Sequence, residues 1–176
     1  MDYRNFFLHS LKHFPIVLIL ILILSRLIPH PPNFTPLIAM SVMSGFFFKE
    51  KFFPLFLILI SIFISDIFLG FYDSMIFVYL SIMLIIFICR IYFKKLNHKN
   101  LIIYSFFGSI TFFLISNFGV WLAGNLYQKN INGLAECFIM ALPFFKNTVI
   151  STFFFSYLAY YADLIANFFY KKKIKI

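Results

Sequence analysis

The chain of 176 residues is 62% hydrophobic and only 12% charged, with a mean hydropathy of +0.95. Soluble domains carry about 25% charged and about 45–50% apolar residues, so this composition excludes a soluble protein and predicts an integral membrane protein. The formal net charge is +9. Because the lysines and arginines lie in short tracts beside apolar runs, we expect them to orient the chain in the lipid bilayer, and we expect no nucleic-acid partner.

Six apolar runs predict an all-α membrane protein built as one integral membrane domain, 1–176. The approximate bounds of the six predicted transmembrane helices are 14–28, 34–48, 52–70, 75–93, 101–122 and 147–170. A complete span takes about 17–25 residues, so the second run is short. The first run follows basic residues as a signal peptide does, but it has no small-x-small cleavage site, which favours an uncleaved first span.

A proline-rich stretch, Ser25–Pro36 with the sequence SRLIPHPPNFTP, separates the first two runs and holds four of the seven prolines. Proline lacks an N–H and moves the residue before it out of the helical region, so no helix continues through this stretch. The stretch is therefore predicted to be a rigid, extended loop. It also carries a dense set of polar side chains, Arg26, His30, Asn33 and Thr35.

The distribution of positive charge predicts the topology. With the N-terminus inside, twelve of the fifteen lysines and arginines fall on inner segments, and the outer segments hold Arg26, Lys129 and Lys146. This asymmetry follows the positive-inside rule and places both termini inside and the proline-rich loop outside. A span through 133–145, GLAECFIMALPFF, would put the basic tail outside. That segment is therefore predicted to be a short helix on the outer face, before the sixth span.

Uncommon polar side chains gather at the predicted outer ends of the spans, where an imported solute would arrive. Asp66 lies about 6 Å below the outer end of its helix, and an ionisable side chain at that depth needs a partner or a wet cavity. It is either a ligand contact, an ion-pair partner of Arg26, or a brace for the proline-rich loop. The candidate substrate-binding residues are Arg26, His30, Asn33, Thr35, Asp66, Asn117, Trp121, Lys146 and Asn147.

These candidates have distinct expected roles. Arg26 and Lys146 would hold a carboxylate or a phosphate, Asp66 and Asn117 would form hydrogen bonds, and Trp121 would stack on the solute. Each role has a structural alternative. An arginine can snorkel to the interface, a tryptophan can anchor a helix at the membrane boundary, and an asparagine such as Asn147 can cap the last helix.

Other patterns bear on packing and on chemistry. Small residues spaced by four, Ser41/Gly45 and Ser61/Ser65, permit close helix packing or the docking of another subunit. One histidine among scattered aspartates does not form a metal site, so neither a metal nor a cofactor is predicted. The sequence contains no GxxxxGK(S/T), HExxH or GxSxG motif, and no catalytic residue is assigned.

Four segments, SRLIPHPPNFTPLIAM, ISDIFLG, SNFGVWL and ALPFFKNT, resemble DUF6580, a family of small bacterial membrane proteins of unknown function described as candidate transport proteins. The resemblance covers about residues 25–150. The family is in turn similar to the substrate-binding S components of energy-coupling factor (ECF) transporters. Those are six-helix proteins that bind vitamins or metal ions from outside and work with a separate transmembrane subunit and two ATPases. This chain differs from many S components in lacking a small-xxx-small motif in its first span. It differs from the nickel and cobalt S components in starting Met1-Asp2, without the early histidine that they use as a ligand.

The resemblance and the outward polar cluster together imply a multi-pass transport protein of the bacterial inner membrane. It would capture a small organic solute, vitamin-like or another micronutrient, on the outer face for import. Its expected partners are the solute, the lipid bilayer, and a transmembrane energising subunit with ATPases on separate chains. Two alternatives stay open: a membrane-embedded enzyme acting on a lipid or isoprenoid with Asp66 and His30 as acid/base groups, and a non-catalytic accessory membrane protein whose polar cluster is structural.

Overall fold

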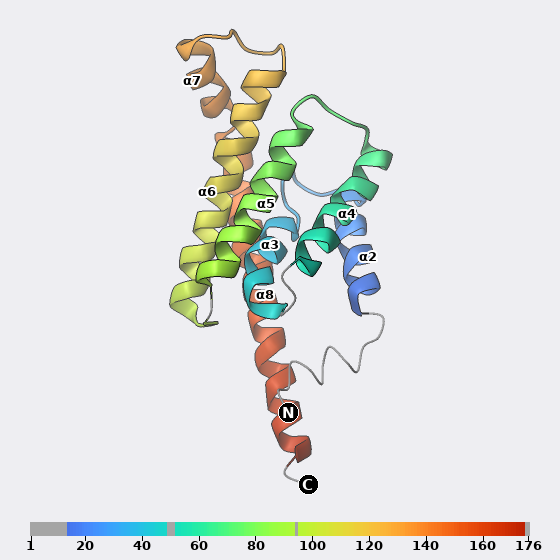
Figure 1. Ribbon diagram of the computed structural model, residues 1–176. Helices are drawn as coiled ribbons and strands as arrows, with labels where there is room; N and C mark the ends of the chain where they lie inside the picture. Colours follow the sequence, from blue (N-terminus) through green and yellow to red (C-terminus); the bar gives the residue numbers. More distant parts are fainter. Residues whose placement is uncertain (1–13, 49–51, 94, 175–176) are drawn as a thin grey trace.

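The computed structural model describes residues 14–48, 52–93 and 95–174, which fold into a bundle of helices (Figure 1). Within these ranges no β-strand occurs, which confirms the predicted all-helical class. The helices, in chain order, are α2 (Phe14–Leu27), α3 (Leu37–Phe47), α4 (Phe53–Leu69), α5 (Met75–Tyr92), α6 (His98–Ala123), α7 (Ile131–Met140) and α8 (Leu142–Ile174).

Three of the described helices are long and apolar enough to cross a membrane: α5, α6, and the part of α8 over Leu142–Ile165. The remaining helices are shorter. The 17 residues of α4 and the 11 residues of α3 cover about 25 Å and about 16 Å, against a hydrocarbon core of about 30 Å. Helix length alone therefore accounts for three of the six predicted spans.

The helix boundaries follow local sequence signals. Pro36 immediately precedes α3, and Pro54 lies in the first turn of α4, where its missing N–H removes no helical hydrogen bond. Asn97 and Asn130 cap α6 and α7, because the side-chain oxygen of each accepts a hydrogen bond of 2.8 Å from the backbone N–H three residues later. These four signals mark the starts of the helices, which lie close to the predicted bounds.

The last helix begins earlier than predicted. A short helix does precede it, but α7 ends at Met140 and α8 begins at Leu142, so the segment 133–145 is divided between the two. Pro143 is the second residue of α8, a position that tolerates proline. Asn147 therefore lies inside α8, and its predicted role as the N-cap is wrong.

Helix α3 lies at the centre of the bundle, in contact with α4, α5, α6 and α8. Its side chains Val42, Met43 and Ser44 are completely buried. Helix α2 packs mainly against α4, and α4 joins this pair to α3 and α5. Figure 1 shows the α2–α4 pair on one side and α5, α6 and α7 on the other. The bundle therefore consists of two parts that are linked through α4.

The chain reverses its direction from each helix to the next over α2 to α6, and α7 and α8 both run back down (Figure 1). The links 28–36, 70–74 and 124–130 lie toward the upper end, and α4 and α6 begin at the lower end. Helix α8 runs back down and extends beyond the other helices. The three links that the sequence assigns to the outer face are thus gathered at one end of the bundle.

The close contact between α3 and α5 depends on a residue without a side chain. A Cβ atom at Gly45 would collide with the backbone carbonyl of Cys89. One turn earlier, Ser41 is buried, and its Oγ donates a hydrogen bond of 2.8 Å to the carbonyl of Leu37. Small residues at this spacing let two helix backbones approach each other closely.

We predict that Gly45→Ala destabilises the protein by about 1–3 kcal/mol, the usual cost of overpacking, because the helix backbone it meets cannot move aside as a flexible side chain can. The measurement is thermal unfolding of the purified protein in detergent. Ala162→Ser, on an exposed position of α8, is the control and should change stability by less than about 0.5 kcal/mol. An unchanged unfolding midpoint for Gly45→Ala would contradict the close α3–α5 contact.

Candidate functional site

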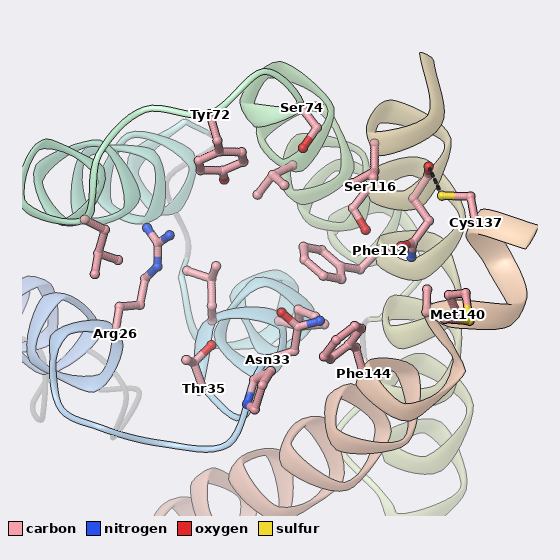
Figure 2. Close-up of a pocket in the computed structure, with 18 of the residues that line it drawn as sticks. Arg26, Asn33, Thr35, Tyr72, Ser74, Phe112, Ser116, Cys137, Met140 and Phe144 are labelled. Carbon is pink, nitrogen blue, oxygen red and sulfur yellow. Dashed lines mark hydrogen bonds between the residues drawn. The ribbon is translucent and has the colours of Figure 1, made fainter. Parts of the chain in front are cut away.

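A cavity of about 650 Å³ lies at the end of the bundle where these links gather (Figure 2). It is bounded by the proline-rich loop, the link 70–74 and the facing parts of α3, α5, α6, α7 and α8. Small-molecule sites typically measure about 300–1,000 Å³, so the cavity has the size of a ligand pocket. The polar side chains that line it are Arg26, His30, Asn33, Thr35, Tyr72, Ser74, Ser116, Asn117 and Tyr127.

The proline-rich loop contains a tight turn over 31–34. The backbone N–H of Phe34 donates a 2.9 Å hydrogen bond to the carbonyl of Pro31. Pro32 supplies the fixed φ that favours the second position of such a turn, and Asn33 has a φ of 61°, in the left-handed region. Asparagine tolerates this region better than most residues other than glycine. The sequence PPNF thus fixes the path of the chain along the pocket wall.

Helix α8 holds this turn in place from behind. The Nδ2 of Asn147 donates a hydrogen bond of 3.1 Å to the carbonyl of Pro32, and the Oγ of Ser151 donates one of 3.2 Å to the carbonyl of Asn33. The ring of Phe34 packs against those of Phe154 and Phe155, with centroid distances of 6.3 and 5.9 Å. Asn147 therefore positions the loop and is not among the residues that line the pocket.

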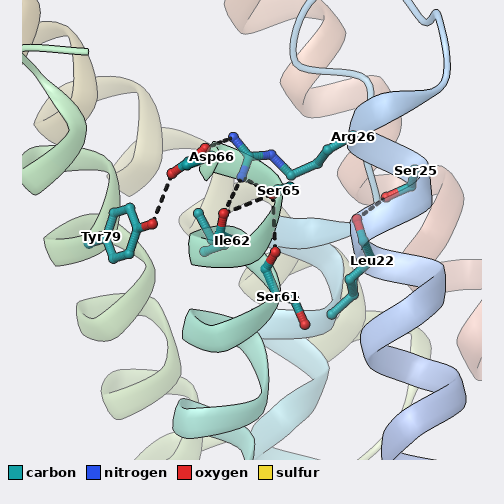
Figure 3. A network of polar contacts seen from close by, with 8 residues as sticks. All are labelled: Leu22, Ser25, Arg26, Ser61, Ile62, Ser65, Asp66 and Tyr79. Carbon is teal, nitrogen blue, oxygen red and sulfur yellow. Dashed lines mark hydrogen bonds and ion pairs between the residues drawn. The ribbon is translucent and has the colours of Figure 1, made fainter. Parts of the chain in front are cut away.

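An ion pair between Arg26 and Asp66 closes the opposite side of the pocket (Figure 3). The Nη2 of Arg26 lies 2.6 Å from Oδ1 of Asp66, and Nη1 donates to the carbonyl of Ile62 at 3.0 Å and to the hydroxyl of Ser65. The hydroxyl of Tyr79 donates to Oδ2 of Asp66 at 2.8 Å. One carboxylate therefore joins α2, α4 and α5.

Burial distinguishes the two partners of this ion pair. The side chain of Asp66 is completely buried and does not line the pocket, whereas that of Arg26 is 15% exposed and does. Both carboxylate oxygens of Asp66 accept hydrogen bonds from protein donors. Three roles were left open for Asp66. This geometry agrees with two of them, the ion-pair partner of Arg26 and the brace for the proline-rich loop, and not with a ligand contact.

Tyr72 faces the pocket from the link between α4 and α5 (Figure 2). Burial raises the pKa of its phenol to about 12, and the negative charge of Asp66 acts in the same direction. The phenol is therefore protonated at neutral pH and is available as a hydrogen-bond donor to a bound molecule.

The structure brings five of the nine predicted site residues into the pocket lining: Arg26, His30, Asn33, Thr35 and Asn117. The amide nitrogen of Asn117 donates to the carbonyl of Phe113 at 2.7 Å, one turn back on α6. The other four predicted residues, Asp66, Trp121, Lys146 and Asn147, do not line it. Lys146 is exposed on α8.

Trp121 supports the link that follows α6. Its Nε1 donates to the carbonyl of Gln128 at 2.9 Å, and the ammonium of Lys129 lies 5.9 Å from the centre of its ring. Lys129 also donates to the carbonyls of Trp121, Leu122 and Gly124, at the end of α6. A lysine at this position compensates the unpaired carbonyls and the negative end of the helix dipole.

Of the residues that α6 contributes to the pocket lining, only Asn117 was predicted from the sequence. Phe112, Ser116 and Val120 line the pocket beside Asn117. Their spacing of four residues places them on one face of the helix, and this was the signal available in the sequence. In a chain with 29 phenylalanines, such a face is not distinguished by composition.

The fold and the pocket define a class. Over its described residues the protein is all-helical, with three helices long and apolar enough to cross a membrane and a ligand-sized cavity at one end. The chain matches DUF6580, described as a family of unknown function, over residues 9–172, and it belongs to that family. No curated protein and no solved structure gave a match.

We predict that Asp66→Ala destabilises the protein by about 3–5 kcal/mol, because it leaves the Arg26 guanidinium largely buried without its counter-charge. Replacing both partners, as Arg26→Met with Asp66→Leu, should recover most of this loss, since an apolar pair of similar volume leaves no unpaired charge. Thermal unfolding of the three proteins in the same detergent tests the prediction. A double variant that is less stable than Asp66→Ala would contradict the role of the ion pair as a brace.

Proposed function

We propose that this protein captures a small organic solute on the outer face of a bacterial inner membrane, as the S components of ECF transporters do. The observation that carries the proposal is the cavity of about 650 Å³ at the end of the bundle where the predicted outer links gather. Vitamin-sized molecules fit cavities of this size, which combine apolar walls with a few fixed polar groups. A vitamin-like solute or another micronutrient is the proposed cargo.

The proposed topology has six spans with both termini inside. The short helices α2, α3 and α4 would complete the set with α5, α6 and α8, and α7 would lie on the outer face. Two observations support this arrangement: the six proposed spans α2, α3, α4, α5, α6 and α8 alternate in direction (Figure 1), and most lysines and arginines fall on the proposed inner side. Helix α3 is largely buried inside the bundle, and beside the short, more exposed helices α2 and α4 the bilayer can become locally thinner at a modest cost.

The proposed mechanism assigns the chain itself only binding and release. Thr35, Tyr72 and Asn117 would hydrogen-bond the solute, and Phe112 and Phe144 would enclose its apolar part. Because the sequence contains no nucleotide-binding loop of the GxxxxGK(S/T) type, the energy for release inward would come from ATPases on separate chains, acting through a transmembrane energising subunit.

The enzyme alternative has less support from the site. It requires Asp66 and His30 as an acid/base pair, yet Asp66 does not line the pocket, and both of its oxygens accept hydrogen bonds from Arg26 and Tyr79. His30 does line the pocket, and its Nδ1 lies 2.7 Å from the carbonyl of Pro31. We therefore favour solute capture over catalysis.

We predict that a thermal-shift screen of water-soluble vitamins and other micronutrients identifies a stabilising solute. Asn117→Leu should weaken its binding at least tenfold, because a buried polar group of the solute loses its partner. Asn125→Leu is the matched control: Asn125 is exposed in the link after α6 and does not line the pocket, so binding should be unchanged. Turnover of a lipid by the purified protein, without any solute that stabilises it, would favour the enzyme alternative.

The topology gives a separate prediction. In intact cells, a membrane-impermeant maleimide should label Asn125→Cys, and it should label Lys99→Cys only after permeabilisation. Both positions are exposed, at the proposed outer and inner ends of α6. Cys89 and Cys137 are buried, and a protein without the added cysteine reports any background labelling. The reverse labelling pattern would overturn the proposed orientation.

A further inference from the structure

The pocket lining is balanced in charge. Among the described residues that line it there is no Asp, Glu or Lys, and Arg26 is its one permanent cation. The charge of Arg26 is matched by Asp66, which lies directly behind it with no exposure of its own. Apart from His30, the wall that a ligand would meet therefore carries no uncompensated charge.

Arg26 still has hydrogen-bonding capacity toward the pocket. A guanidinium carries five N–H donors; three are used by Asp66, Ile62 and Ser65, and Arg26 also donates toward the hydroxyl of Tyr72. The donor that remains, together with the hydroxyl proton of Tyr72, can serve a carbonyl or another neutral acceptor. A carboxylate or phosphate at the same place would compete with Asp66 for one cation and would leave a buried negative charge without a partner, which is costly.

The two strongest hydrogen-bond donors that line the pocket, Arg26 and Tyr72, lie on one side of it. Figure 2 shows Arg26, Thr35 and Tyr72 on one side of the cavity, and Phe144 and Met140 on the other, together with Ser116. Further apolar residues line the cavity from several elements, among them Leu69 of α4, Val78 of α5, Leu126 in the link after α6 and Ala141 at the junction of α7 and α8. A ligand that fits both sides has a ring or another flat apolar body at one end and hydrogen-bonding groups at the other.

We infer that the ligand is an uncharged, ring-bearing molecule with amide or carbonyl acceptors at one end. This inference rests on the proposed function and names its substrate class. It replaces the expectation that Arg26 and Lys146 hold an anion, because Lys146 is exposed outside the lining and the charge of Arg26 is already paired. Arg26 and Tyr72 would donate hydrogen bonds to the acceptors, and the rings of Phe112 and Phe144 would contact the apolar body.

The first test uses probes that differ mainly in charge. One series is nicotinamide, nicotinate and 1-methylnicotinamide, which are neutral, anionic and cationic on nearly the same frame. The other is N-acetyltryptophanamide and N-acetyltryptophan, which are neutral and anionic. Equilibrium dialysis against the purified full-length protein in nanodiscs should show the neutral member of each series binding at least tenfold more tightly than its charged counterparts.

The second test shifts the charge balance. Asp66→Asn keeps the shape of the side chain and leaves Arg26 uncompensated, so the neutral-over-anion preference should fall at least tenfold. Arg26→Gln combined with Asp66→Asn removes both charges and should restore the preference for neutral probes. Size-exclusion chromatography establishes that each variant is folded, and the double variant keeps the test decisive where the single variant does not fold.

Three outcomes would overturn the inference. If nicotinate or N-acetyltryptophan binds the unaltered protein more tightly than its neutral partner, and Arg26→Gln abolishes that binding, the site takes anions while the proposed solute capture stands. If Asp66→Asn is folded and leaves the preference unchanged, the ion pair does not set the pocket charge. If no probe binds, the neutral ring-bearing class is wrong, and the micronutrient screen decides the proposed function independently.

Discussion

A buried carboxylate, that of Asp66, links the two parts of this helical bundle, because it pairs with Arg26 of α2 and accepts a hydrogen bond from Tyr79 of α5. Helix α2 packs mainly on α4, so α2 is attached to α3 and α5 chiefly through α4. A fully buried carboxylate costs several kcal/mol unless its charge and its lone pairs are satisfied. Arg26 and Tyr79 satisfy the two oxygens of Asp66 separately, from α2 and from α5. The requirement to satisfy one carboxylate therefore holds three helices in register, and the low dielectric of the interior strengthens each contact.

The pocket is fixed by residues that do not line it. On one side, Asp66 and Tyr79 hold the guanidinium of Arg26 in place; on the other, Asn147 and Ser151 hold the carbonyls of the proline-rich turn. None of these four supporting side chains is part of the lining. A binding site whose first layer is held by a second layer, and whose loop already has restricted φ values, loses little conformational entropy when a ligand enters.

Much of the fold could be predicted from the sequence, because hydrophobic runs and prolines act locally. The run boundaries agree with α4 and α5 to within a residue or two at each end, and the proline-rich stretch is a loop. The start of α8 could not be located in the same way, since Pro143 is compatible both with a helix end and with a first turn. The sequence showed that Asp66 needed a partner, but only the packing of α2 on α4 decides that Arg26 supplies it.

The pocket was harder to predict than the fold, because its walls are made of ordinary residues. Ser116 and Phe112 are residue types that also occur in ordinary helix contacts of membrane bundles, and they are pocket residues only because the surrounding helices leave a cavity beside them. By contrast, Trp121 and Lys146 were conspicuous in the sequence and lie outside the lining. Trp121 hydrogen-bonds the backbone of the link after α6. A residue that is conspicuous in the sequence can therefore stabilise a helix end and need not contact a ligand.

The cations on the proposed outer side show the same division between support and recognition. Lys129 donates to the carbonyls at the end of α6, Lys146 is exposed away from the lining, and Arg26 is paired with Asp66. With the outer cations placed in this way, recognition in the pocket would depend on shape, aromatic surface and neutral hydrogen bonds. Such a site rejects a wrong solute mainly when the solute covers polar groups such as the Tyr72 hydroxyl or the side-chain carbonyl of Asn117 without pairing them, and this penalty is larger than that of a missing methylene group. The ion pair would then serve stability and selectivity together, since the carboxylate that ties α2 to α5 also removes the charge that would otherwise attract anions.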